Sequence, residues 1–309
     1  MLYTDDYIRG IFNNCKCKNF IQNENGIIDD PELSEYIDNV IEDVKKSMPE
    51  NVANTIANNK TQYEIEHAAN DIQVMFLNTI SDISIAIFNY LMKKYYEESD
   101  VYKRVLCNIL NHSMQYFEAI FAMYIDNTKV AILPQLRILY ENYITFRFIG
   151  RHPDLAQPYF DHAILNKYKI VKEYNLQFSN ADRVDEERLL QIYSKEFIKS
   201  YGWLPQSYRK PNMGAVESME KDRPIEGSNE IYKISSDYIH SSPFVIFHDK
   251  IVDGLVSKYL YSVVVFLTNQ IIELTDYYKC EPGDRILTMN LLYGLREDLY
   301  GEMPFSLKE

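Results

Sequence analysis

The chain has 309 residues, of which 46% are hydrophobic and 25% are charged, as is ordinary for a globular protein. This length can bury a large core, in one helical domain or two smaller ones. The formal net charge of −13, from 45 acidic and 32 basic residues, disfavours indiscriminate binding to nucleic-acid backbone or anionic membrane. This net charge is still compatible with a local basic cleft.

The cysteines and apolar runs predict a cytoplasmic protein. Four cysteines at positions 15, 17, 107 and 280 lack the spacing of a disulfide framework, and no secretory signal pattern is present. Both observations favour a reducing compartment. The best membrane candidate, residues 259–272, is too short and too polar to span a bilayer, so no membrane contact is expected.

Helical periodicity can be followed through most of the chain after residue 28. Residues 1–28 are expected to form a polar extension with a short helix near 3–12. Asp29-Asp30-Pro31-Glu32 predicts the start of a helix that ends at Pro49. Further helices are expected at 61–98, 101–125, 129–152, 154–176, 182–201, 214–222, 228–241, 248–279 and 283–300. The prediction is an all-α bundle of about eight to ten helices, with an N-terminal helical extension at 1–60 and a main domain at 61–309.

The helix at 129–152 is apolar at every angle, which is typical of a central, buried helix. Arg137 and Glu141 are four residues apart, so they share one face of it. Charges on a buried helix require partners, so this pair is expected to be a polar inset held by tertiary contacts.

A second polar stretch, YKISSDYIHSSP, covers residues 232–243. Ser236 and His240 are four apart, so on a helix the hydroxyl can orient the imidazole, and Tyr232 extends the same ridge by one turn. His240 is interpreted either as a proton-transfer group or as a structural histidine that satisfies a buried acceptor such as Glu141.

These two stretches together resemble an uncharacterised bacterial family of domains of unknown function. That family carries an Arg-x-x-x-Glu helix and a Ser-Glu-Tyr-Val-His helix, which correspond here to Arg137 with Glu141 and to Ser236 with His240. The similarity covers about residues 85–275, and Asp237 and Ile239 depart mildly from the pattern. The resemblance implies a helical fold related to HEPN domains, homo-oligomer formation, and a setting in toxin or phage-defence systems.

Many HEPN relatives are ribonucleases with an Arg-x(4–6)-His motif. One match occurs here, Arg147 to His152, at the end of the central helix. With 6 His in the chain, a match by chance is common, so these two residues are secondary candidates.

Two functions are therefore open. In the first, the protein is a HEPN-like ribonuclease or an RNA-interacting protein. As a ribonuclease it would use Arg137, Glu141, Ser236 and His240 without a metal: His240 transfers the proton, Arg137 holds the phosphate and Glu141 orients either one. In the second, the same residues form a structural network in a non-enzymatic module that recruits a protein partner, or that senses a small ligand.

No cofactor and no metal site is expected. Cys15-x-Cys17 lacks a second ligand pair, and neither Glu64-x-Glu66-His67 nor His240 with His248 has convincing ligand geometry. The phosphate-binding loops of nucleotide-binding folds are absent. Trp203, in the irregular stretch 201–214, is expected to fill the edge of a core.

Overall fold

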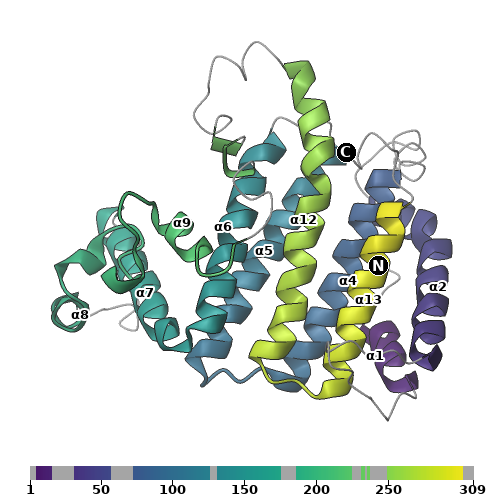
Figure 1. Ribbon diagram of the computed structural model, residues 1–309, viewed down its shortest axis with the longest axis horizontal. Coiled ribbons are helices and arrows are strands. Elements are labelled where there is room, and N and C mark those ends of the chain that lie inside the picture. Colours follow the sequence, from purple (N-terminus) through teal and green to yellow (C-terminus); the bar gives the residue numbers. More distant parts are fainter. Residues whose placement is uncertain are drawn as a thin grey trace. The chain divides into compact units, whose positions relative to one another are not determined.

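The computed structural model describes residues 5–15, 31–56, 72–125, 131–174, 186–224, 231–233, 235–236 and 249–301. Every regular element in these ranges is a helix, which confirms the expected all-α class (Figure 1). The described residues fall into two compact units. Unit 1 comprises Met1–Tyr96, Leu110–Tyr143 and Gly227–Glu309, and unit 2 comprises Glu97–Ile109 and Ile144–Glu226. The predicted boundary near residue 60 lies outside the described residues.

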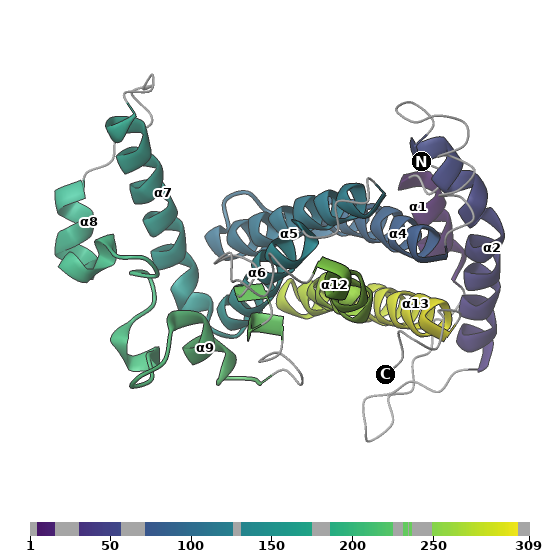
Figure 2. The same cartoon turned by 90° about the horizontal axis from the view of Figure 1, so that it is seen from above.

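Three long helices form the centre of unit 1: α4 (Ile72–Tyr95), α12 (Asp249–Tyr277) and α13 (Pro282–Gly301). Each packs against the other two, and Figures 1 and 2 show them side by side. In the described part of the chain, one span, Val74–Tyr95 in α4, is long and apolar enough to cross a membrane. Because 78% of its most apolar window is buried by the protein itself, α4 is accounted for as a core helix.

The N-terminal helices α1 (Asp5–Asn14) and α2 (Pro31–Ile56) pack on α4, and α2 also packs on α13. A Cβ at Gly294 would lie 2.7 Å from Ile41 Cδ1, so this glycine allows α2 and α13 to approach closely. The prediction that the second helix ends at Pro49 is wrong, because α2 continues through Pro49 to Ile56. Burial of Val44 and Met48 on the preceding turns holds the helix in place, which offsets the backbone hydrogen bond that proline removes.

A polar cluster joins the last turn of α4 to the first turn of α13. The buried carboxylate of Asp284 accepts hydrogen bonds from Tyr90 (3.2 Å), from Lys94 (2.9 Å) and from the Tyr95 hydroxyl. Lys94 also reaches Glu281 at 2.9 Å. Burial and the bond to Asp284 raise the pKa of Tyr95 to about 12, so its hydroxyl stays a donor at neutral pH. Burial disfavours the Lys94 ammonium, but its bonds to the two carboxylates outweigh this and raise its pKa.

Helices α5 (Val101–Ile125) and α6 (Ile132–Arg151) lie close to their expected positions. Asp100 caps α5, because its Oδ1 accepts the backbone N–H groups of Tyr102 at 2.9 Å and Lys103 at 3.2 Å. Pro134 lies in the first turn of α6, where its missing N–H costs little. The second half of α6 is buried without interruption from Tyr143 to Gly150, as expected for a central helix.

Unit 2 contains the rest of the helices between α6 and residue 224. They are η2 (Pro153–Leu155), α7 (Ala156–Glu173), α8 (Glu186–Tyr193), η4 (Lys195–Ile198), η5 (Gln206–Tyr208) and α9 (Ala215–Glu220). The single helix predicted for 182–201 is wrong, because α8 ends at Tyr193 and the backbone of Ser194 takes a left-handed conformation with φ 83°. This break lets Phe197 enter the core and stack on Tyr193, with ring centroids 4.3 Å apart.

The irregular stretch after η4 is tightly packed. Trp203 is 4% exposed and meets Tyr159 edge to face, so the expectation that it fills the edge of a core is confirmed. A Cβ at Gly202 would lie 2.3 Å from the Phe197 carbonyl oxygen, so this position requires glycine. Arg209 holds the turn by donating to the carbonyl oxygens of Tyr201 (2.7 Å) and Leu204 (3.2 Å).

The last predicted helices correspond to α12 and α13. Of the helix expected at 228–241, residues 231–233 and 235–236 are described, and they are helical. The remainder of that prediction, including His240, lies outside the described residues.

Candidate functional site

The predicted pair on α6 is present in unit 1. Arg137 Nε donates to Glu141 Oε1 at 2.9 Å, across one helical turn. The two side chains are 18% and 26% exposed, so the pair lies at the edge of the core and reaches solvent. At this exposure the desolvation cost is well below that of a fully buried ion pair.

Arg137 also contacts the polar stretch predicted to face it. Its Nη1 donates to Ser236 Oγ at 3.3 Å, although the two residues are 99 positions apart in the sequence. Its Nη2 donates to the Tyr232 hydroxyl at 2.9 Å, and the guanidinium carbon lies 4.4 Å from the centroid of that ring. The guanidinium is therefore held by a carboxylate, two hydroxyls and an aromatic ring.

A layer of aromatic rings supports this arrangement. Tyr140, on α6 and 1% exposed, meets Tyr232 edge to face at 6.4 Å and packs at 5.9 Å on Phe266 of α12. Ser235 is fully buried and donates to the Ile231 carbonyl oxygen at 2.6 Å, which fixes the helical turn that presents Tyr232 and Ser236. Tyr140 and Phe266 were not predicted as site residues, because their roles depend on contacts between distant segments. For Tyr140, its position three residues after Arg137 on an apolar helix was a signal.

Three of the four first-choice residues thus meet: Arg137 contacts both Glu141 and Ser236. The fourth, His240, lies outside the described residues, and its meeting with them stays a prediction. An arginine side chain has five N–H donors, and these three contacts use three of them. Since Arg137 is partly exposed, its guanidinium is able to offer donors to an anionic ligand.

The secondary candidates, Arg147 and His152, lie in unit 2. His152 Nε2 is 3.5 Å from Asp222 Oδ2, and its Nδ1 is 3.4 Å from the Tyr208 hydroxyl. Arg147 is 7% exposed and lines a small pocket together with Arg151 and Asp222. The pocket residues on α6 follow a helical ridge, so the sequence contained a signal for them in the spacing of Ile144, Arg147, Phe148 and Arg151.

The residues considered as metal ligands are mostly outside the described ranges: Cys17, Glu64, Glu66, His67, His240 and His248. Within the part of the chain that the structure describes, no group of three or more His, Cys, Asp or Glu side chains converges as a metal site would require.

A comparison with family models matches residues 103–253 to a family of unknown function (DUF5677). This region of the chain is therefore similar to the DUF5677 family. The prediction of an uncharacterised domain family is therefore confirmed, and the matched region contains both halves of the polar site. No curated protein and no solved structure matches the chain.

Proposed function

We propose that the DUF5677 region is an RNA-cleaving domain of the HEPN-like kind, which uses Arg137, Glu141, Ser236 and His240 without a metal ion. The observation that carries the proposal is the contact between Arg137 and Ser236. It brings a partly exposed guanidinium to the segment on which His240 follows four residues later, one turn on if the helix continues.

In the proposed reaction His240 removes the proton of an RNA 2′-hydroxyl, and the resulting oxygen attacks the neighbouring phosphorus. Arg137 stabilises the negative charge that develops on the phosphoryl oxygens. The 5′-oxygen leaves and takes up the proton, so the products are a 2′,3′-cyclic phosphate and a 5′-hydroxyl. Glu141 acts as a positioning residue, because its bond to Nε fixes the plane of the guanidinium.

The experiment is cleavage of a mixed RNA panel in the presence of EDTA, by the wild type and by Arg137→Lys. Lysine keeps the charge but loses the planar fork, so we expect the rate to fall by about 10²-fold or more. Arg296→Lys is the matched control. Arg296 also packs over a tyrosine ring, Tyr293, at 4.5 Å, and donates to Asn269 at 3.2 Å in the same unit.

Loss of cleavage in Arg137→Lys alone, with cyclic phosphate ends on the wild-type products, supports the proposal. Equal rates in all three folded proteins would contradict it.

A second candidate is a non-enzymatic module in which this network only braces the helices. The charge distribution favours it: unit 2 contains 15 basic and 15 acidic residues, which leaves 17 basic and 30 acidic residues, a net charge of −13, in unit 1. Such a charge repels RNA from the rest of unit 1 and attracts a basic protein partner. Under this candidate no RNA in the panel is cleaved, and Arg137→Lys changes only stability.

We expect a toxin or phage-defence role and homo-oligomer formation from the family resemblance. We expect a cytoplasmic location from the composition. Light scattering on the purified protein tests the oligomeric state directly.

A further inference from the structure

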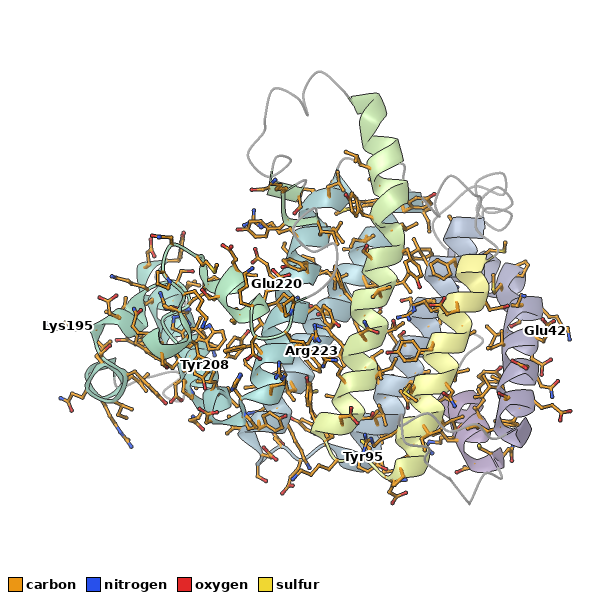
Figure 3. The ribbon with its side chains drawn as sticks, viewed as in Figure 1. Glu42, Tyr95, Lys195, Tyr208, Glu220 and Arg223 are labelled. Carbon is orange, nitrogen blue, oxygen red and sulfur yellow. The ribbon has the colours of Figure 1, made fainter. Side chains whose placement is uncertain are left out.

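Unit 2 contains a small pocket that the proposed RNA-cleaving residues do not use. One wall is the ridge at the end of α6, and the other is the end of α9 with the turn that follows it. Its lining combines apolar and charged side chains. The lining residues are Ile144, Phe148 and Met219, with Arg147, Arg151, Glu220, Asp222 and Arg223. Glu220 and Arg223 are labelled in Figure 3.

The charged lining residues have a small positive net charge in a protein whose total charge is negative. Three arginines and two acidic residues line the pocket, so its net charge is +1 before His152 is considered. The surrounding unit is neutral by sequence, whereas unit 1 has a net charge of −13. An anion therefore meets less repulsion here than near Arg137.

Arg151, one of the lining arginines, is held in place by the protein. Arg151 Nη1 donates to Asp222 Oδ2 at 2.6 Å and to the Asp222 carbonyl oxygen at 3.2 Å. The same carboxylate lies 3.5 Å from His152, which packs against Phe148 with ring centroids 4.6 Å apart. An arginine fixed in this way loses little side-chain entropy when it binds a tetrahedral oxyanion.

We propose that this pocket binds the terminal phosphate group of a small phosphorylated ligand, with Arg151 and Arg223 as its main ligands. Arginine presents paired N–H donors that match the geometry of phosphate oxygens. The pocket is small and open to solvent, so the anionic group binds at its opening, among the arginine side chains, while the rest of the ligand stays outside. The proposal is independent of RNA cleavage at Arg137, because the two sites share no residue.

The test is the melting temperature of the full chain in increasing inorganic phosphate, with ionic strength held constant by sodium chloride. We expect phosphate to raise it for the wild type, because a ligand that binds only the folded state stabilises that state. We expect Arg223→Gln and Arg151→Gln to weaken phosphate affinity by about tenfold or more, which corresponds to one charge-assisted hydrogen bond.

Lys221→Gln is the matched control, since Lys221 is exposed, is two residues from Arg223 and does not line the pocket. It removes the same charge and should leave the phosphate effect unchanged. No rise in the wild type, or the same rise in all four proteins, would overturn the proposal.

A second series compares a nucleoside 5′-monophosphate with the unphosphorylated nucleoside. We expect the monophosphate to bind with the same dependence on Arg223, and the nucleoside not to bind. Nucleoside binding as strong as that of the monophosphate would place recognition outside the phosphate group and would also overturn the proposal. A negative result for phosphate binding would not change the outcome of the RNA-cleavage assay, and a negative cleavage assay would not change the phosphate result.

Discussion

Arg137 is fixed by side chains from two segments that are almost one hundred positions apart in the sequence. The i, i+4 spacing of Arg137 and Glu141 was sufficient to predict their contact, because a helix determines which side chains are neighbours. The contact of Arg137 with Ser236 agrees with the hypothesis that a guanidinium on a buried helix needs tertiary partners. The place of Tyr232 on the same ridge as Ser236 was predicted. The packing of its ring against the guanidinium was not, because it depends on how two distant helical segments pack.

The exposure of this network sets the size of its contribution to stability. Had Arg137 been fully buried, its replacement by alanine would cost about 3–5 kcal/mol. Since the Arg137 and Glu141 side chains are 18% and 26% exposed, we expect Arg137→Ala to lower the free energy of unfolding by only about 1–2 kcal/mol. Urea denaturation measures this change.

Tyr232→Phe removes only the hydroxyl and serves as the second arm of a double-mutant cycle. Because the two side chains are in contact, their effects should be non-additive by at least about 0.5 kcal/mol. Purely additive effects would mean that the contact does not stabilise the fold.

His162 supplies a pH dependence in unit 2. It is 8% exposed, lies 3.0 Å from the Lys199 carbonyl oxygen through Nε2, and lies 3.1 Å from Asn166 Nδ2 through Nδ1. Burial lowers its pKa, nearby Lys169 lowers it further, and the bond to Lys199 opposes both only in part. The folded protein therefore takes up this proton at lower pH than the unfolded chain does.

The sign of the effect follows from that difference. The stability due to neutral His162 is fully present above the unfolded pKa of about 6.5, and it is lost as the pH falls through the lower folded pKa. As the pH is lowered from 7.5 to 5, we expect the melting temperature of the wild type to fall more than that of His162→Gln. The glutamine amide is able to donate to the same Lys199 carbonyl oxygen but does not titrate. Parallel curves would contradict a neutral, buried His162.

At the scale of elements, periodicity located the long helices well because each buries an apolar face with a 3.6-residue repeat. It failed where tertiary packing overrides local preference. Pro49 does not end α2, whose neighbouring turns are buried, and α8 stops without a Gly or Pro because Phe197 turns into the core. Neither outcome has a local sequence signal.

The cluster between α4 and α13 should be the most costly polar contact to break. Asp284 is 8% exposed, accepts bonds from three side chains of α4, and lies in the first turn of α13, where a carboxylate also suits the helix dipole. We expect Asp284→Asn to lower the free energy of unfolding by about 2–4 kcal/mol, measured by urea denaturation.

Glu281→Gln is the matched control, because Glu281 bonds to the same Lys94 but its side chain is 69% exposed. That substitution should cost at most about 1 kcal/mol. Equal losses in the two variants would show that burial of Asp284 is not what makes the cluster important.

For the whole molecule, the net charge of −13 lies entirely in unit 1 by sequence, while unit 2 is neutral. Composition predicted the total but not this division, because unit 2 joins the start of α5 to residues 144–226 and only the fold brings them together. RNA that reaches the Arg137 site must overcome this field. We therefore expect cleavage to be faster as salt rises from very low levels, since salt screens the repulsion.

The most direct test of the proposed function is RNA cleavage, in EDTA, by the wild type, His240→Ala and His112→Ala. His112 is the control because it is an exposed histidine of unit 1, whose ring meets Asn142 at 3.2 Å. We predict cleavage by the wild type and by His112→Ala, and a loss of about 10²-fold or more in folded His240→Ala. Equal cleavage by all three proteins, or cleavage by none of them, would contradict the assignment of His240 and Arg137 to an RNA-cleaving site.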